Sequence, residues 1–514
     1  MALALLAVAA CSGGDDDQRG RIGYVTGFLG GVAADEPRAA LVGRDVLSAG
    51  GSAADAAVAV AFALSVTLPS SAGLGAGGVC VTYHSGNNEA WALDFRSANG
   101  TAAAGQRPVA VPGLPRGMFA LHSKYGRLHW AQVLAPAENI ARFGEPISRA
   151  LARDLSRAAG RVTGTPDLRA LFTRPGGREV VGESELLVQL ELAGTLGQLR
   201  GRGPGDLYSG RLGRQVVDAV AAAGGGLTME DMRNFSPRWV QPLTVKAGNE
   251  NVYFPPAPVM GGNAAAQMFA YFEDSDRYED ASDEARLHVL AETAARAWSL
   301  GTADAGGRER KGAREVRVEP LERLMASYRA DRHTPVDGAP GLPAGGASTG
   351  FVVVDRDASA VACTLTMNAP FGAGRVAEGS GIILAAPTQE PAASAGLAPA
   401  LVVNRNVQEF FFGAAPSGGA QGTTALVEVL ARMTLMKQAA RDAQLAPRAH
   451  NGGSPDVTRT EQDTGLGARG HRVEVVPALG LVNVVACPDG IPPDPDTCQS
   501  LADPRGAGLA ASAD

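Results

Sequence analysis

The chain has no excess of basic residues and no motif typical of a metal site. Its 46 Lys and Arg residues are outnumbered by 53 Asp and Glu residues, which gives a net charge of −7 without any Lys/Arg stripe. This balance argues against a nucleic-acid partner. The seven histidines are scattered and form no HExxH pattern, and no CxxC pattern occurs. The sequence therefore offers no metal site, and no cofactor is expected.

Long apolar runs are also missing, apart from residues 1–10 at the start of the chain. Ten residues are too few to cross a bilayer as a helix, and no other segment approaches the ~18 apolar residues that a span needs. The run resembles a signal peptide, and the small residues before Cys11 resemble a bacterial lipoprotein box. We expect a signal peptide at 1–10, lipidation of Cys11 and a tether at 11–21. The protein would then be an exported bacterial lipoprotein, either periplasmic or anchored to the outer membrane. A ragged apolar end is the alternative, because the usual basic residues are absent.

Cysteines are few, five in all. Cys487 and Cys498 bracket a loop rich in Pro and Asp, which an exported protein could close with a disulfide. Cys80 and Cys363 lie in apolar, strand-like runs, so we expect them to be inert buried thiols.

Glycine and proline are abundant, with 66 and 32 residues, but below the level of a disordered chain. A long helix is predicted over 36–66, and a Gly-rich loop over 73–78 then leads into a strand at 79–83. The order helix, loop, strand excludes a dinucleotide-binding loop and favours close backbone approach. Residues 301–347 show no regular spacing of apolar residues, so we predict that this segment is an exposed linker. Behind it, short strands are predicted at 351–355, 360–366, 381–385 and 401–404. Helical, strand-rich and again helical sections predict an α+β fold, a four-layer α-β-β-α sandwich.

A hydroxyl pair, Ser348 and Thr349, stands on a Gly-rich loop immediately before the strand at 351–355. A Ser or Thr that becomes a chain terminus carries its own general base, because the free α-amine titrates near pH ~8. The alternative is an ordinary turn before a strand.

Ordered short motifs then run along nearly the whole chain. They are the segments at 50–57 and 73–78, Leu93-Asp94-Phe95-Arg96, Val111-Pro112-Gly113, Pro255-Pro256, Phe371-Gly372, Gly418-Gly419 and Asp503-Pro504-Arg505. Together they resemble the γ-glutamyltransferase family of N-terminal-nucleophile hydrolases. The resemblance implies a precursor that cuts itself between Ala347 and Ser348. The products are a large part, 22–347, and a small part, 348–514, which stay together as a heterodimer. Ser348 becomes the nucleophile where most members have Thr, and Thr349 is the alternative.

The resemblance also assigns partners to the nucleophile. Gly418 and Gly419 correspond to the backbone amides that stabilise the oxyanion, and Thr366 to the hydroxyl that orients the nucleophile. Asn368 corresponds to an amide that contacts the substrate, and Arg96 to the arginine that clamps the α-carboxylate of a glutamyl donor. The alternatives are a Gly turn, plain strand residues and a surface arginine.

The donor site departs from the family pattern. Of the acidic pair that closes on the donor's amine, Glu390 alone could supply charge, and Ala395-Gly396 stands where the family has two serines. Each missing charged contact should weaken recognition by ~1–3 kcal/mol.

Three functions follow. The first is a self-processing γ-glutamyltransferase or hydrolase acting on glutathione-like amides, with water or an amine as acceptor. The second is an acylase for other amides, and the third an unprocessed lipoprotein of the same fold that binds or scaffolds.

Overall fold

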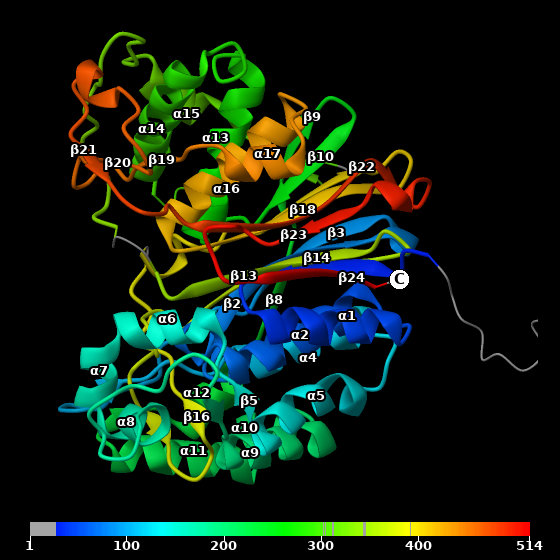
Figure 1. The fold of residues 1–514 in the computed structure, drawn as a ribbon, viewed down its shortest axis with the longest axis vertical. Coiled ribbons are helices and arrows are strands. Elements are labelled where there is room, and N and C mark those ends of the chain that lie inside the picture. The colour runs from blue at the N-terminus through cyan, green and yellow to red at the C-terminus, as the bar shows by residue number, and fades with distance from the viewer. Residues whose placement is uncertain are drawn as a thin grey trace, which may run out of the picture.

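Two stacked β-sheets with helices on both outer faces make up the protein (Figure 1). The computed structural model describes residues 27–301, 303, 305–310, 313–342, 346–390 and 392–513. The expected signal peptide at 1–10, Cys11 and the whole tether at 11–21 lie outside these residues. Within them, no helix is both long and apolar enough to cross a membrane.

The first sheet has the strand order β24-β1-β13-β14-β2-β3-β8. Its strands span, in that order, Leu509–Ala513, Gly30–Ala34, Ser348–Asp355, Ala360–Thr366, Gly77–His84, Glu89–Asp94 and Arg238–Val240. The interior strand β13 pairs antiparallel with β1 and β14. A strand from more than 300 residues earlier in the sequence and the strand that comes next therefore flank the strand that carries the hydroxyl pair.

The second sheet has the order β11-β12-β9-β10-β17-β18-β22-β23. Its strands span Gly306–Arg310, Ala313–Val316, Leu243–Ala247, Glu250–Phe254, Ala400–Asn404, Glu409–Ser417, Leu481–Ile491 and Gln499–Leu501. Smaller sheets pair β4 (Arg107–Pro108) with β7 (Gly225–Gly226), β5 (Glu145–Pro146) with β6 (Leu186–Leu187), β15 (Val376–Ala377) with β16 (Ile382–Ile383), and β19 (Ala449–Asn451) with β20 (Thr458–Thr460) and β21 (Val473–Val475).

One helical layer lies below the first sheet in Figure 1. Its helices are α1 (Pro37–Ser48), α2 (Ala53–Thr67), α3 (Pro69–Ala72), α4 (Leu114–Tyr125), α5 (Trp130–Phe143), α6 (Arg149–Arg157), α7 (Ala159–Gly164), α8 (Pro166–Phe172), α9 (Leu190–Arg202), α10 (Gly205–Ser209), α11 (Arg211–Ala222) and α12 (Met229–Asn234). The layer above the second sheet holds α13 (Met260–Ser275), α14 (Asp283–Ser299), α15 (Glu319–Met325), α16 (Ala420–Thr434) and α17 (Ala440–Leu445). The four-layer α-β-β-α sandwich predicted from the sequence is confirmed.

Alternation along β13 divides the core between two layers. Phe351 and Val353 belong to the hydrophobic cluster shared with α1 and α2. Val352 and Val354 belong to the cluster between the two sheets. Side chains two residues apart face the same side of a strand. The even-numbered residues of β13 therefore face the second sheet.

The prediction of a long helix over 36–66 is wrong in one respect, because this segment forms two helices, α1 and α2. After α1 ends at Ser48, the chain turns and Ser52 caps α2 in a reciprocal capping box with Asp55. Every residue of α2 is buried, as its run of small and apolar side chains requires. The linker predicted over 301–347 is likewise partly ordered, since it contains β11, β12 and α15.

The expectation that Cys80 and Cys363 are free thiols is also wrong. They lie directly opposite each other on β2 and β14 and form a disulfide. Their strands pair across 283 residues of sequence, and only that pairing brings the two sulfurs together. Cys487 and Cys498 form a second disulfide that closes the loop between them.

Candidate active site

Ser348 begins β13 and points at a pair of backbone amides in the turn that follows β18 of the second sheet. Its Oγ accepts hydrogen bonds from the N–H groups of Gly418, at 3.1 Å, and Gly419, at 3.4 Å. The two glycines connect the end of β18 to the start of α16, with φ values of 98° and 70°. A side chain is strained at such φ values, so this turn requires glycine. The backbone donors thus converge on one hydroxyl, as an oxyanion site needs.

Thr366 faces Ser348 across the β13–β14 ladder. Its hydroxyl donates to the carbonyl oxygen of Ala347 at 2.9 Å, and the N–H of Met367 donates to the same oxygen at 3.2 Å. The sequence had predicted a contact from Thr366 to the nucleophile. In this uncut chain the Thr366 hydroxyl is directed instead at the carbonyl of the bond between Ala347 and Ser348.

Thr349, the alternative nucleophile, points away from that carbonyl into the interior. Its side chain is fully buried, and its hydroxyl donates to Asp35 Oδ2 at 2.9 Å. Asp35 also accepts from the N–H of Gly350 and from Asn483 Nδ2. Burial raises the pKa of Asp35, and these hydrogen bonds oppose the shift only in part. Sequence reasoning missed Asp35, because no local pattern marks a carboxylate that meets β13 from the end of β1.

Arg96 is already paired with carboxylates of its own chain. Its guanidinium donates to Asp94, at 3.0 Å from Nε, and to Glu390. Arg238 approaches the other oxygen of Asp94 at 2.7 Å. Burial acts to raise the pKa of Asp94, but the hydrogen bonds and charge of Arg96 outweigh it and lower that pKa. The predicted carboxylate clamp is therefore neutralised in the structure by Asp94 and Glu390.

The remaining predicted donor-site residues, Asn368 and Glu390, are each hydrogen-bonded within the chain. Asn368, with φ 61°, donates from Nδ2 to the carbonyl of Ala386 at 2.8 Å. Glu390 Oε2 accepts from the hydroxyl of Ser394 at 2.5 Å. Gly396 lies against the oxyanion turn, since a Cβ built on it would stand 2.8 Å from Gly419 Cα. A serine at this position would need Gly419 to move.

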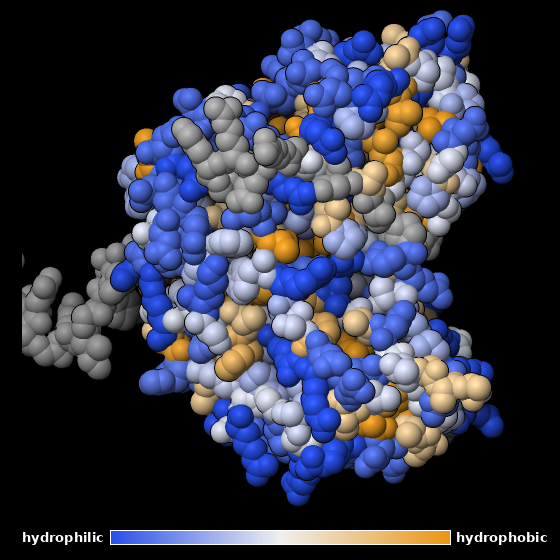
Figure 2. All heavy atoms as spheres, turned by 180° about the vertical axis from the view of Figure 1, so that it is seen from behind, coloured by the Kyte–Doolittle hydropathy of each residue, from blue (hydrophilic) through white to orange (hydrophobic). Residues whose placement is uncertain are grey.

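Ser348 opens into a cavity of about 720 Å³. The cavity lies between α6 and the start of α16, and Figure 2 shows the molecule hollowed on one edge between its two helical layers. Four arginines line it, Arg153, Arg157, Arg161 and Arg505, together with the carboxylates Asp35 and Asp154. Arg505 is paired with Glu461, so the positive charge that a substrate beside Ser348 meets comes from the three arginines of α6 and α7.

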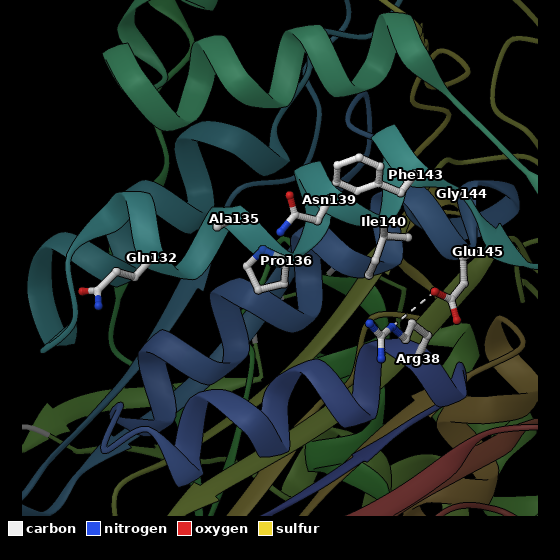
Figure 3. A pocket seen from close by; sticks show the side chains of 9 residues that line it. All are labelled: Arg38, Gln132, Ala135, Pro136, Asn139, Ile140, Phe143, Gly144 and Glu145. Atoms are coloured by element: carbon white, nitrogen blue, oxygen red, sulfur yellow. Dashed lines mark ion pairs between the residues drawn. The ribbon is translucent and has the colours of Figure 1, made fainter.

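A second pocket, of about 440 Å³, lies on the helical layer between α1 and α5 (Figure 3). Arg38 and Glu145 face each other across it at 3.4 Å. It shares no lining residue with the cavity at Ser348, and no Ser, Thr or Cys lines it. This pocket therefore offers no nucleophilic hydroxyl or thiol of its own.

The four-layer order (Figure 1) is that of the fold class of N-terminal-nucleophile hydrolases. Structural similarity supports this class: the chain matches a cephalosporin acylase from Bacillus halodurans with a TM-score of 0.77 at 22% identity, over 98% of this chain and 99% of the other. It matches Helicobacter pylori γ-glutamyltranspeptidase with a TM-score of 0.51 at 26% identity, over 62% of this chain and 95% of the other.

The family profile described as Gamma-glutamyltranspeptidase matches residues 39–394, and the chain belongs to this family. A glutathione hydrolase proenzyme from Pseudomonas aeruginosa is 30% identical over 73% of this chain and 70% of its own length. The proenzyme from Escherichia coli is 28% identical over 90% and 89%. Glutathione hydrolase 3 of Arabidopsis thaliana is 29% identical, and the match spans 62% of that protein. The family of enzymes inferred from the sequence motifs is confirmed.

Proposed function

We propose that the chain is a self-processing γ-glutamyl hydrolase or transferase whose nucleophile is Ser348. The observation that carries the proposal is the arrangement of donors around the bond from Ala347 to Ser348. The carbonyl oxygen of Ala347 accepts from Thr366 Oγ1 and Met367 N, while Ser348 Oγ lies against Gly418 N. One set of donors serves the bond that is cut, and the other serves the nucleophile.

In the cleavage step, Ser348 Oγ attacks the carbonyl carbon of Ala347. Negative charge develops on the carbonyl oxygen, where the Thr366 hydroxyl and the Met367 amide stabilise it. The C–N bond breaks as the nitrogen takes a proton, and an ester links Ala347 to the Ser348 hydroxyl. Water hydrolyses this ester, which leaves a carboxylate on Ala347 and a free α-amine on Ser348.

In turnover, the freed α-amine of Ser348 takes the proton of its own hydroxyl as that oxygen attacks an amide substrate. The N–H groups of Gly418 and Gly419 stabilise the substrate's oxyanion. The acyl group then passes from Ser348 to water or to an amine. Thr349 is a weaker candidate, because its buried hydroxyl is committed to Asp35.

A second candidate function has the same chemistry but a different acyl group in the substrate: an acylase for other amides. It is favoured by the state of the donor site, where Asp94 and Glu390 already occupy Arg96. Gly396 leaves no room beside Gly419 for a serine that would contact an α-carboxylate. The arginines of the Ser348 cavity, in contrast, offer positive charge to an anionic group elsewhere on the substrate.

Two measurements test these proposals. Mass spectrometry and N-terminal sequencing of the purified, reduced protein should find a fragment that begins at Ser348. An intact chain would contradict self-processing, and a fragment beginning at Thr349 would shift the nucleophile. Turnover of a γ-glutamyl anilide, compared with glutaryl and fatty-acyl anilides, then separates the two substrates. If kcat/KM is highest for the γ-glutamyl anilide, the first function is supported. If kcat/KM is low for the γ-glutamyl anilide and higher for the glutaryl or fatty-acyl anilide, the acylase is supported.

We further propose that the protein is exported as a lipoprotein anchored through Cys11, on the support of the apolar run and the small residues before this cysteine. Labelling of cells with a fatty-acid probe should mark the wild type and not Cys11→Ala.

A further inference from the structure

A cluster of imidazole and carboxylate groups lies in the upper helical layer, outside the site at Ser348. His288 and Glu292 stand four residues apart on α14, and His471 follows the 3-10 turn at Leu466–Arg469. One ligand atom from each of the three lies within 4.8 Å of the other two. His288 Nδ1 is 2.7 Å from His471 Nε2, and that nitrogen is 3.8 Å from Glu292 Oε1.

A fourth side chain, His333, completes the cluster from the segment that precedes the Ala347–Ser348 bond. Its Nδ1 is 2.5 Å from Glu292 Oε1. The side chains of His288, Glu292 and His471 are buried, and that of His333 is 8% exposed. Three nitrogens and one oxygen are thus held in a nearly dry interior.

The far side of each ring is fixed by a different outer partner. His288 Nε2 lies 2.8 Å from the carbonyl oxygen of Arg329, and His471 Nδ1 lies 2.8 Å from Thr458 Oγ1. His333 Nε2 lies 2.8 Å from Asp456 Oδ2. Histidines that bind metals almost always present this arrangement, with the second nitrogen held by a carbonyl, a hydroxyl or a carboxylate.

The carboxylate is oriented in the same way. Glu292 Oε2 accepts from Arg296 Nη1 at 2.9 Å and from Thr334 Oγ1 at 2.7 Å, which leaves Oε1 directed toward the imidazoles. Oε2 is thus anchored by two donors, while Oε1, which accepts from His333 Nδ1 and from the N–H of Thr334, faces the imidazoles.

We propose that His288, Glu292 and His471 bind a divalent zinc ion, with His333 or water as the fourth ligand. Zinc takes imidazole nitrogen and carboxylate oxygen at ~2.0–2.2 Å in a tetrahedron, which sets ligand atoms about 3.3 Å apart. The separation of 2.7 Å between His288 and His471 and that of 3.8 Å between His471 and Glu292 bracket this value, and all three ligand atoms lie within 4.8 Å of one another.

The two histidines of this site are suited to metal in a further respect. Their facing nitrogens, His288 Nδ1 and His471 Nε2, lie on the side of each ring that faces Glu292 Oε1 and away from the outer partners. Sequence analysis did not predict the site, because His471 is 183 residues from His288 and no short motif joins them.

The site joins the two expected products of cleavage. His288, Glu292 and His333 precede the bond between Ala347 and Ser348, and His471 follows it. A bound ion would therefore hold the large and small parts together after cleavage. This role rests on the proposed self-processing, whereas binding of zinc does not.

Zinc binding is tested on the full chain after removal of metal with EDTA. Equilibrium dialysis against Zn²⁺, followed by elemental analysis, should give one ion per chain. Addition of Co²⁺ in its place should produce the intense visible bands of a tetrahedral site. Zn²⁺ should also raise the melting temperature of the stripped protein. The proposal is overturned if the stripped wild type holds no zinc after dialysis against Zn²⁺, or if Co²⁺ gives only the weak visible bands of an octahedral site.

Variants separate a metal site from a network of hydrogen bonds alone. His471→Gln keeps a polar group of similar reach beside His288, so a network would survive, but it should weaken Zn²⁺ binding by at least about tenfold. Glu292→Gln should do the same. The matched control is His129→Ala, an exposed histidine at the start of α5, which should bind zinc like the wild type. Unchanged zinc affinity in both His471→Gln and Glu292→Gln overturns the proposal.

Ser348→Ala distinguishes this inference from the proposed function. The uncut variant should still bind one Zn²⁺. If the wild type binds zinc but is never cleaved, the metal site stands and self-processing fails. If it is cleaved at Ser348 but binds no zinc, self-processing stands and the metal site fails.

Discussion

The hydroxyl of Thr366 donates a hydrogen bond to the carbonyl oxygen of Ala347 over 2.9 Å. The pairing of β13 with β14 places these two residues, since Ser348 and Thr366 are register partners at the end of the ladder. The N–H of Met367 approaches the same oxygen. A carbonyl that accepts two donors before any reaction is polarised for attack, and the donors are already in place for the charge that follows.

Replacing Thr366 by Val should therefore slow cleavage of the chain. Loss of one donor at a developing oxyanion lowers a rate by about 10²–10³-fold. The rate of cleavage is measured from the appearance of the fragment that begins at Ser348, monitored over time on gels under reducing conditions. Thr366→Ser keeps the hydroxyl and is the matched control, which should process within a few-fold of the wild type. Equal rates for Thr366→Val and the wild type would contradict the role of this hydroxyl.

The disulfide between Cys80 and Cys363 crosses the expected cleavage site, because Cys80 precedes Ser348 and Cys363 follows it. A cleaved chain should therefore run as one band on a denaturing gel without reductant and as two bands with it. The double variant Cys80→Ala/Cys363→Ala should give two bands in both conditions.

The second disulfide supplies the control for that experiment. Cys487 and Cys498 both lie after Ser348, so their removal should leave the single band without reductant unchanged. Two bands from cleaved, alkylated wild type in the absence of reductant would show that the covalent link is not formed.

Gly396→Ser should impair turnover rather than restore glutamyl recognition. A Cβ at this position would stand 2.8 Å from Gly419 Cα, so the oxyanion turn must shift. A displacement of about 1 Å at a catalytic group can lower a rate about 100-fold. Steady-state kinetics of the processed variant with a γ-glutamyl anilide should show a lower kcat.

Gly160→Ser on α7 is the matched control, because a Cβ there meets nothing within 4 Å. It should keep the kcat of the wild type. A higher kcat/KM for the γ-glutamyl substrate in Gly396→Ser would instead mean that the added hydroxyl finds the donor's carboxylate without disturbing Gly419.

The layers of the fold could be predicted from sequence, while most contacts of the site could not. Short apolar runs mark the strands, and β14 spans Ala360–Thr366 as predicted, because its alternation is local. The disulfide at Cys80 depends on which strands become neighbours, which local pattern does not contain. The pairing of Arg96 with Glu390 likewise joins residues 294 apart. A motif places Arg96 in the site but does not reveal that carboxylates of the same chain neutralise it.

Asp35 should make the stability of the chain depend on pH. Burial raises its pKa in the fold above the ordinary value of 3.8. Between these two pKa values the folded chain holds a proton that the unfolded chain has lost, so stability falls as pH rises through that range. The contribution is fully present below about pH 4 and is lost once Asp35 ionises in the fold.

Asp35→Asn should remove the part of the fall in folding stability with rising pH that comes from the ionisation of Asp35. The variant is made in a Ser348→Ala background, so that all chains stay uncut, and urea unfolding is measured in steps from pH 4 to pH 8. Asn cannot accept all the hydrogen bonds from Thr349, Gly350 and Asn483, so its stability should be lower by about 1–3 kcal/mol at acid pH. The difference from the parent should narrow as pH rises. The exposed Asp489→Asn serves as control and should follow the parent at every pH. A constant difference between Asp35→Asn and the parent would show that Asp35 does not titrate in this range.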